Sequence, residues 1–234
     1  MDTQAPDEAR ILDSWSKNVA AWTEAVRQGQ IESRRLVTDR AVIQAVLDAA
    51  PRSVLDIGCG EGWLVRRLAA QGIEATGVDA IPALVEQARS TGGGNFRVAS
   101  YADLAAGRLE LRVDLAVCNF ALLGKESVEE LFHALPALLH PGGRFIVQTL
   151  HPLSACGDAA YADGWREGSW SGFSADFTDP PPWYFRTLES WIRLFQESGF
   201  GLREMREPLH PVTSKPASVI FIAGLVANLD MQCK

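Results

Sequence analysis

The sequence predicts an α/β protein with a Rossmann-like, doubly wound sheet and helices on both faces. Short apolar runs typical of buried parallel strands alternate with segments of helical periodicity. The first apolar run leads into the turn Asp56-Ile57-Gly58-Cys59-Gly60-Glu61-Gly62, and the second ends at Asp79. Such alternation produces right-handed crossovers and a mostly parallel sheet, so both features are expected at the carboxyl edge, where open α/β sheets bind ligands.

The individual elements follow from apolar periodicity and from their boundary residues. Strands are expected at residues 54–57, 75–78, 95–99, 113–118, 144–150, 202–206 and 218–223. Helices are expected at residues 7–28, 32–49 and 63–70, after Pro82, after a capping-box pattern of Ser127 and Glu130 with a kink at Pro136, and from Thr187 to Ser198.

Composition indicates one ordinary globular domain over residues 1–234. The hydrophobic content of 47% is enough for a large core, and no apolar run approaches the roughly 20 residues that cross a bilayer. We therefore expect a cytoplasmic protein with no membrane partner. A formal net charge of −7 argues against nucleic acid as a partner. The four cysteines are widely spread, which suggests neither a disulfide framework nor a zinc site.

The glycine spacing distinguishes between two kinds of bound nucleoside. A dinucleotide-binding turn has the pattern G-x-G-x-x-G, whereas this chain has D-x-G-x-G-x-G with no glycine at the later helical position. The pattern therefore favours a ligand without phosphates lying across the loop. The carboxylate of Asp79 can accept hydrogen bonds from the two vicinal hydroxyls of a ribose. The alternative is a tight strand-to-helix turn with Asp79 as an ordinary cap.

Asp56 to Gly62, with an acid at the end of the next strand, resembles the nucleoside-binding motif of the class I S-adenosylmethionine-dependent methyltransferases. The likeness continues through residues 113–124 and the turn Leu139-His140-Pro141-Gly142-Gly143, covering roughly residues 50–150 in order. The resemblance implies a seven-stranded sheet with an antiparallel last strand. It also implies metal-independent methyl transfer from S-adenosylmethionine to a small organic acceptor by in-line displacement, leaving S-adenosylhomocysteine.

The resemblance divides the chain into four parts and assigns the donor site by position. Residues 1–50 form an N-terminal helical cap, 51–150 the donor-binding core, 151–187 a substrate or lid insertion, and 188–234 a C-terminal helix and strands. The residues expected to bind the donor are Asp56, Gly58, Cys59, Gly60, Gly62, Asp79, Ala80, Ile81, Ser100, Tyr101, Ala102, Asn119, Phe120 and Arg35.

The insertion after the fifth strand is rich in aromatic residues, and we expect it to set substrate specificity. Its length exceeds that of a simple connection, and such loops commonly carry binding function. Aromatic walls exclude water and stabilise a sulfonium cation. The alternative is a hydrophobic cluster that merely covers the sheet edge. The residues expected to contact substrate are Tyr161, Trp165, Trp170, Trp183 and Arg186, with Arg186 equally well explained as a solvated helix-start residue.

His151 directly follows the fifth strand and is the candidate catalytic base. Histidine near neutral pH can accept a proton from a hydroxyl or ammonium nucleophile. A positional role is equally compatible with the sequence, with the ring hydrogen-bonded to backbone while Pro152 stiffens the turn.

Two further regions add to the candidate site. Trp15 and Trp22 lie seven residues apart on one helical face and are expected to contact substrate. Arg34 and Arg35 are candidates for the donor carboxylate; at most one can serve, and we take Arg35. Core tryptophans and surface arginines explain these four residues equally well.

The adenine end departs from the family pattern. After the third strand many members have an acid that meets the adenine amino group, whereas Asp103 is displaced here. Adenine contacts are therefore expected from the backbone around Tyr101, and Asp103 is equally well explained as a helix cap. The strand end at Asn119 and Phe120 lacks the acids that metal-dependent relatives use, so no metal ligand is expected.

Two other function classes remain compatible with parts of this pattern. A nicotinamide-dependent oxidoreductase would also use a glycine loop and Asp79, although the glycine spacing disfavours it. A non-catalytic protein that binds S-adenosylmethionine would keep the donor pocket and use the aromatic insertion as an interaction surface. The sequence does not indicate the acceptor, the methylated atom or the oligomeric state.

Overall fold

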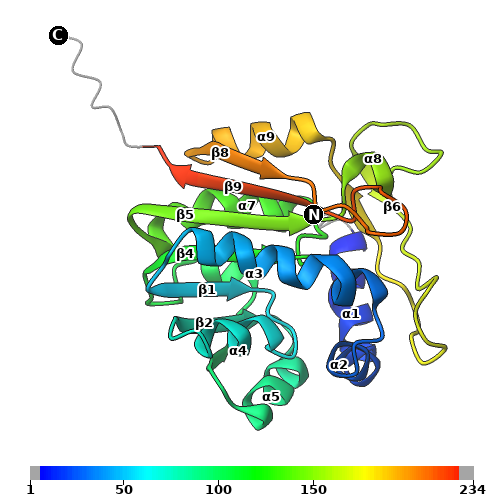
Figure 1. The fold of residues 1–234 in the computed structure, drawn as a ribbon, viewed down its shortest axis with the longest axis horizontal. Coiled ribbons are helices and arrows are strands. Elements are labelled where there is room, and N and C mark those ends of the chain that lie inside the picture. The colour runs from blue at the N-terminus through cyan, green and yellow to red at the C-terminus, as the bar shows by residue number, and fades with distance from the viewer. Residues whose placement is uncertain (1–5, 227–234) are drawn as a thin grey trace.

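A computed structural model describes residues 6–226, whose strands form a seven-stranded sheet in the order β3-β2-β1-β4-β5-β9-β8 (Figure 1). The strands are β1 Ser53–Ile57, β2 Glu74–Asp79, β3 Asn95–Val98, β4 Val113–Asn119, β5 Leu139–Thr149, β8 Phe200–Arg206 and β9 Val219–Leu225. Strands β1 to β5 pair in parallel, and β9 runs antiparallel between β5 and β8. The predicted seven-stranded, doubly wound architecture is therefore confirmed.

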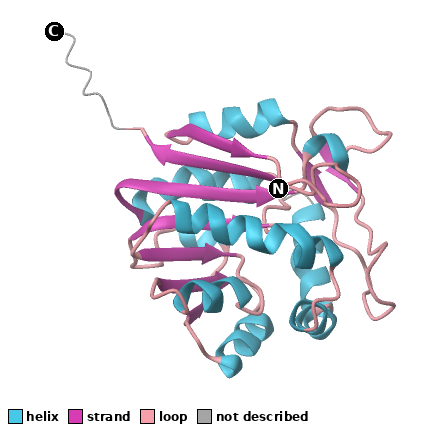
Figure 2. Ribbon diagram, viewed as in Figure 1, coloured by secondary structure: helices cyan, strands magenta, loops and turns pink. Residues whose placement is uncertain are grey.

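Helices cover both faces of the sheet (Figure 2). They are α1 Pro6–Lys17, α2 Val19–Arg27, α3 Asp39–Asp48, α4 Trp63–Ala69, α5 Pro82–Thr91, α6 Tyr101–Ala105, α7 Glu126–Ala134, α8 Pro152–Ala155 and α9 Leu188–Glu197, with a π-helical turn η1 at Arg34–Thr38 and a 3-10 turn η2 at Leu135–Leu138. The 3-10 turn stands where Pro136 was expected to disturb the helix, because proline cannot supply a helical N–H.

The strands bury both faces by strict alternation. In β5, Phe145 and Val147 join the core under α6, α7 and α9, while Ile146 between them joins the core under α3, α4 and α5. Side chains along a strand point alternately to opposite faces, so each central strand contributes to both cores. The sheet is thereby held rigidly between two helical layers, and its carboxyl edge stays fixed.

The insertion and the N-terminal helices lie beyond the carboxyl ends of the parallel strands (Figure 1). The insertion contains α8 and a separate two-stranded ribbon of β6 Gly164–Arg166 and β7 Trp183–Phe185. This part of the fold covers the edge at which the glycine loop ends.

The N-terminal region differs from the two continuous helices predicted. The first prediction, residues 7–28, is broken into α1 and α2 at Asn18, and the second begins with the π-helical turn before α3. Asn18 is buried, and its side chain bonds to the backbone of Thr178 in both directions, at 2.7 and 2.9 Å. A tertiary contact therefore decides where the first helix ends. No helix among residues 6–226 is long and apolar enough to cross a membrane.

The capping box predicted from Ser127 and Glu130 is wrong. Helix α7 begins after Lys125, which makes no side-chain cap. Instead, Glu8 Oε1 accepts hydrogen bonds from the backbone N–H groups of Lys125 at 2.8 Å and Ser127 at 3.2 Å. A carboxylate at this end satisfies unpaired N–H groups and opposes the helix dipole favourably. Helix α1 thus caps α7 from a distance.

Replacing Glu8 with Ala is expected to lower the free energy of unfolding by about 1 to 2 kcal/mol, the usual cost of losing a helix cap. Urea unfolding followed by circular dichroism measures this loss. Ser127→Ala is the matched control and should change stability little, because its hydroxyl does not cap the helix. The assignment fails if Ser127→Ala destabilises the protein more than Glu8→Ala does.

Candidate active site

The glycine loop between β1 and α4 is fixed to the end of β2. The N–H groups of Gly58 and Cys59 both donate to the Val78 carbonyl, at 2.8 and 3.0 Å. Gly58, Gly60 and Gly62 have φ angles of +75°, +56° and +86°, in the left-handed region that side chains disfavour. A Cβ on Gly62 would also collide with the Phe96 ring. The turn therefore requires glycine for both conformation and space.

Asp79 ties the loop to the strand end. Its Oδ2 accepts the Gly60 N–H and its Oδ1 accepts the Ile81 N–H, each at 2.9 Å. Burial raises the pKa of Asp79, whereas the N–H groups of Ile81, Gly60 and Ala80 lower it. Each carboxylate oxygen has two lone-pair directions, so each can accept one more hydrogen bond. Asp79 thus both shapes the loop and keeps capacity for a ligand hydroxyl.

Asp56 is buried near the end of β1, just before the glycine loop. The residue is 2% exposed, and no described residue donates a hydrogen bond to its carboxyl group. Burial raises the pKa of Asp56 to about 8, with the neighbouring Asp79 carboxylate adding to the increase and Arg34 opposing it. Asp56 is therefore largely protonated at neutral pH. Cys59 packs against Gly77, and burial raises the pKa of its thiol, as expected for an apolar filler.

A cavity of about 310 Å³ opens beside this loop. It lies between the loop, the end of β4, the N-terminal helices and the insertion. Ten of the residues predicted from the sequence line it: Gly58, Cys59, Gly60, Asn119, Phe120, Trp15, Trp22, Trp170, Trp183 and Arg186. The lining does not include Asp79 or residues 100–102. Asp79 lies behind Gly60, which lines the cavity and donates its N–H to the Asp79 carboxylate.

Much of the cavity wall was not predicted from the sequence. The additional lining residues are Ile31, Ser33, Arg34, Trp63, Leu122, Leu123, Thr149, Leu150, Pro152, Ala155, Gly168, Ser169, Phe173, Pro181, Tyr184, Phe185 and Trp191. The aromatic density of the insertion already pointed to Phe173, Tyr184 and Phe185. Thr149 and Leu150 lie at the carboxyl end of the fifth strand. Open α/β sheets bind ligands at this edge, so the sequence could have indicated both residues.

The choice of Arg35 as the inward-facing arginine is not supported by the structure. Arg34 lines the cavity and is 8% exposed, whereas Arg35 is exposed and lines a neighbouring cavity. The Arg34 guanidinium lies 4.7 Å from the Trp63 ring centroid and 5.6 Å from that of Trp22, and its Nε donates to Asp39 at 2.9 Å. Arg34 and Arg35 point in different directions from the π-helical turn, and Arg34 is the one that faces the cavity beside the glycine loop.

The N-terminal helices and the insertion close over the cavity together. Besides the paired bonds between Asn18 and Thr178, the Ser14 hydroxyl donates to the Asp179 carbonyl, and Lys17 pairs with the Asp179 carboxylate at 3.0 Å. Trp15 meets Trp22 and Trp170 edge to face, with centroids 5.0 and 5.7 Å apart. The predicted role of Trp15 and Trp22 in this wall agrees with their positions, and Trp22 also lies over Gly60.

The end of β4 carries an oriented amide and a strained backbone. Gln148 is buried and donates to Asn119 Oδ1 at 2.7 Å, which leaves the Asn119 amino group to face other partners. Phe120 has a φ of +55°, and its N–H donates to the Gln148 carbonyl at 2.8 Å. A non-glycine residue held in this region is uncommon and is concentrated at binding sites.

His151 occupies the positional role that the sequence had left open. The ring is 1% exposed and caps α8, with Nδ1 accepting the Leu153 N–H at 3.3 Å and Nε2 bonded to Glu207 Oε1 at 2.7 Å. Both ring nitrogens are therefore engaged, and His151 does not line the cavity. This geometry does not favour the catalytic base.

Three of the predicted substrate contacts, Arg186, Tyr161 and Trp165, have structural roles through their hydrogen bonds and packing. Arg186 is buried rather than solvated, and donates to the carbonyls of Gly124 and Lys125 at 2.9 and 3.0 Å. Tyr161 is 42% exposed and accepts the Leu188 N–H, while Trp165 packs on the Tyr184 ring. Neither Tyr161 nor Trp165 lines the cavity. Tyr161 and Trp165 therefore lie behind the aromatic wall, whereas Arg186 is part of it.

The segment after β3 is a helix start. Ser100 and Asp103 form a reciprocal capping box. The hydrogen bonds from Ser100, together with one from the Arg108 side chain, lower the pKa of Asp103 to about 2. Asp103 is thus a cap, as one of the two alternatives proposed. The Tyr101 hydroxyl donates to the Ala121 carbonyl at 2.9 Å, next to Gly58.

Protonation of Asp56 should make stability depend on pH. The pKa is higher in the folded protein than the ordinary value of 3.8, so the folded state holds a proton between about pH 4 and 8 that the unfolded chain has lost. This contribution to stability is present below pH 4 and is lost as the pH rises through 8. Asp56→Asn is neutral throughout, so its stability relative to the native protein should rise across this interval and level off above it.

Urea unfolding at intervals from pH 5 to 9 measures this difference. Asp114→Asn is the control: hydrogen bonds from the backbone of Arg52 and Ser53 lower the pKa of that carboxyl group, so it is ionised in both states from pH 5 to 9 and its stability difference from the native protein should not change with pH. A pH-independent difference between Asp56→Asn and the native protein would contradict the assignment.

Comparisons with known proteins identify the family of the chain. The model of the methyltransferase domain family matches residues 31–204. A ubiquinone biosynthesis O-methyltransferase of Xanthomonas oryzae pv. oryzae is 35% identical over 118 residues, which cover 48% of this chain and 49% of that protein. A malonyl-[acyl-carrier protein] O-methyltransferase of Hahella chejuensis is 26% identical over 153 residues, covering 64% and 53%. The chain spans about half the length of the curated relatives it matches.

Solved structures share the whole architecture. The 1,6-didemethyltoxoflavin-N1-methyltransferase of Burkholderia thailandensis, with its acceptor and S-adenosylhomocysteine bound, has a TM-score of 0.67 at 18% identity and covers 97% of this chain and 92% of its own. The magnesium protoporphyrin IX methyltransferase of Synechocystis PCC 6803 has a TM-score of 0.66 at 17% identity, covering 94% and 100%. The family match spans most of the chain, and the chain therefore belongs to the methyltransferase domain family, as the glycine loop and Asp79 indicated.

Proposed function

We propose that this protein transfers a methyl group from S-adenosylmethionine to a small organic acceptor. The observation that carries the proposal is the juxtaposition of the glycine loop and Asp79 with an aromatic-lined cavity at the carboxyl edge of the sheet. Bound there, S-adenosylmethionine supplies an electrophilic methyl group on a positively charged sulfur.

The residues present fit such a donor. Gly58 and Gly60 line the cavity, where backbone without a side chain can approach the methionine and ribose parts, and the remaining lone pairs of Asp79 suit a ribose diol. Arg34, rather than Arg35, has the burial and position to pair with the donor carboxylate. A side chain on Gly58 would collide with Ala121, so we expect the segment after β4 to withdraw from Gly58 as the ribose reaches Asp79.

The walls of the cavity indicate a largely apolar, cyclic acceptor. Rings of Trp22, Phe120, Trp170 and Trp183 face it, and flat rings favour stacking on a flat ligand. The similar structure from Burkholderia thailandensis holds a cyclic acceptor, 1,6-didemethyltoxoflavin, and the relatives from Xanthomonas and Hahella are O-methyltransferases. We propose an acceptor of the same kind, with the Asn119 amino group available to orient it.

Orientation supplies most of the rate in this proposal. In-line displacement needs the nucleophile opposite the departing sulfur, and holding both groups in place reaches effective molarities on the order of 10⁵ to 10⁸ M. The aromatic walls exclude water and stabilise the sulfonium by about 0.5 to 2 kcal/mol per well-placed ring. A strong base is then unnecessary for acceptors that are already nucleophilic.

The alternatives raised by the sequence predict different results. The family match argues against a nicotinamide-dependent oxidoreductase. A non-catalytic protein would bind the donor yet transfer no methyl group to any member of a broad metabolite panel. Incubation of the panel with donor labelled in the methyl group distinguishes these cases, and transfer to a flat cyclic compound is the result we expect.

Replacing Asp79 with Ala is expected to weaken binding of S-adenosylmethionine at least tenfold, because the ribose loses a charged acceptor and the loop loses its tie to β2. Isothermal titration calorimetry measures the affinity. Asp103→Ala is the matched control, since its carboxylate caps α6 outside the cavity, and it should bind the donor as the native protein does. Unchanged affinity in Asp79→Ala would refute the donor site.

Replacing His151 with Ala should lower stability and leave turnover within about threefold, far from the 10²- to 10⁴-fold contribution typical of a general base. The expected loss of stability is about 1 to 3 kcal/mol, since a buried cap and its partners lose their hydrogen bonds. Steady-state kinetics on the identified acceptor, at a temperature where the variant stays folded, test this. A hundredfold fall in turnover would restore His151 as the base.

A further inference from the structure

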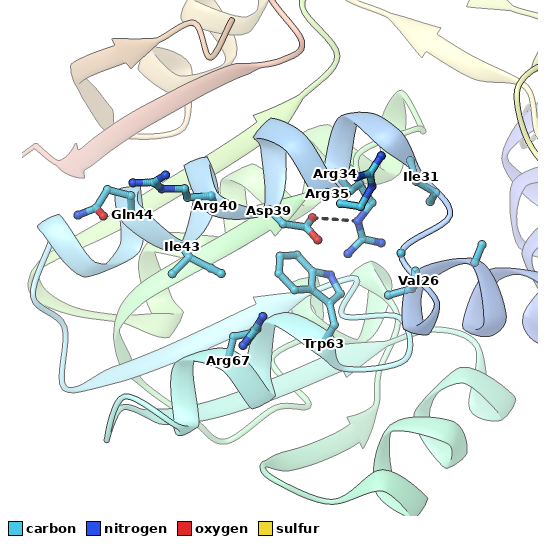
Figure 3. A pocket seen from close by; sticks show the side chains of 12 residues that line it. Val26, Ile31, Arg34, Arg35, Asp39, Arg40, Ile43, Gln44, Trp63 and Arg67 are labelled. Atoms are coloured by element: carbon cyan, nitrogen blue, oxygen red, sulfur yellow. Dashed lines mark hydrogen bonds and ion pairs between the residues drawn. The ribbon is translucent and has the colours of Figure 1, made fainter. Parts of the chain in front are cut away.

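A second cavity lies beside the candidate active site, on the side away from the insertion. Its volume is about 460 Å³, and it is enclosed by α2, the segment from η1 to α3, and α4. In Figure 3 Trp63 and Arg67 on α4 lie below the helix that carries Arg34, Arg35, Asp39, Arg40 and Gln44. Val26 and Ile31 close one end. Nothing in the proposed methyl transfer uses most of these side chains.

The charge of this cavity opposes that of the protein. Four arginines, Arg34, Arg35, Arg40 and Arg67, line it against one acid, Asp39, although the whole chain carries a formal net charge of −7. Asp39 pairs with Arg34 at 2.9 Å. Within residues 6–226, the guanidinium groups of the other three arginines make no hydrogen bond or ion pair. Guanidinium groups gathered around one hollow repel each other, and an anion between them removes that cost.

Arg34 gives the cavity a buried hydrogen-bond donor. Only 8% of the Arg34 surface is exposed, and its Nη2 has no hydrogen-bond partner within the described chain. A buried donor without a partner is unfavourable, and such groups are usually satisfied by water, an ion or a ligand. The planar guanidinium suits paired hydrogen bonds to an oxyanion.

We propose that this cavity binds a small phosphate-bearing molecule. A single carboxylate would need one arginine, whereas the excess of arginines here matches the two or more charges of a phosphate ester or diphosphate. Trp63, Ile31 and Ile43 provide an apolar surface for the organic part of the ligand. The volume falls within the range of small-molecule sites, and the three helical segments that border the cavity make it concave, unlike the extended basic face that binds nucleic acid.

This site is separate from the proposed donor site. The two cavities share Ile31, Arg34 and Trp63, but Arg35, Arg40 and Arg67 line the second without lining the first, and the glycine loop lines the first without lining the second. Binding of the phosphate compound can therefore be measured without S-adenosylmethionine. The proposal does not depend on the methyl-transfer activity.

Calorimetric titration of the full chain with inorganic pyrophosphate, at constant ionic strength, tests the proposal. The native protein should bind it, and Arg40→Gln with Arg67→Gln should weaken binding at least tenfold, because two charge-assisted contacts are lost. These two arginines are exposed, so the variant should fold, and unchanged thermal unfolding confirms it. The double variant Arg97→Gln, Arg112→Gln is the control, because it removes the same charge from exposed positions outside the cavity.

Three outcomes would overturn the proposal. They are no binding of pyrophosphate by the native protein, equal affinity in the two double variants, and tighter binding of a short single-stranded oligonucleotide than of pyrophosphate at equal phosphate concentration. Asp79→Ala should bind pyrophosphate as the native protein does. If Asp79→Ala loses donor binding but keeps pyrophosphate binding, the two proposed sites bind their ligands independently.

Discussion

The hydrogen bond from the Gly60 N–H to Asp79 joins the two halves of the candidate site. It fixes a turn whose three glycines adopt left-handed backbone angles, and it does so from the end of the neighbouring strand. The rigid parallel pairing of β1 with β2 sets where these two groups meet. Without the register of the sheet, the loop would have no fixed partner, and without the loop the cavity would lose one wall. Asp56 is buried close to Asp79, and burial and that neighbouring carboxylate both raise its pKa.

Features determined by neighbouring residues were predictable from the sequence. The seven strands lie within a few residues of the expected ranges, except that β5 begins at Leu139, inside the turn expected at residues 139–143. The glycine loop and the Thr187 cap of α9 also lie where expected, since the Thr187 hydroxyl accepts the Ser190 N–H. Features determined by distant residues were not. Glu8 caps α7 across 117 residues and replaces a locally plausible box, and Asn18 ends a helix because it meets Thr178. A local pattern contains no information about such partners.

The orientation of the two adjacent arginines depends on a different physical feature. Arg34 and Arg35 are adjacent, and helical phase alone decides which one faces inward. The π-helical turn at residues 34–38 shifts that phase, and the sequence shows no proline or glycine inside the segment to signal it. Burial between Trp22 and Trp63 compensates for the irregular turn, since a guanidinium over aromatic faces gains favourable contact. Likewise, the aromatic content of the insertion predicted a pocket, while the division of its rings between lining and support depends on the β6–β7 pairing.

Arg34 stands at the boundary of the two cavities, and its contacts determine how they can influence each other. Its Nε is held by Asp39 and its faces are covered by tryptophan rings, so the guanidinium plane is fixed before any ligand arrives. A ligand in either cavity would contact the edge of the Arg34 guanidinium group. Because that edge offers several N–H groups in fixed directions, two anions need not compete for one hydrogen bond, although their charges repel each other across it. Any coupling between the sites must be reciprocal in binding free energy, and Arg34 is the residue through which it would be transmitted.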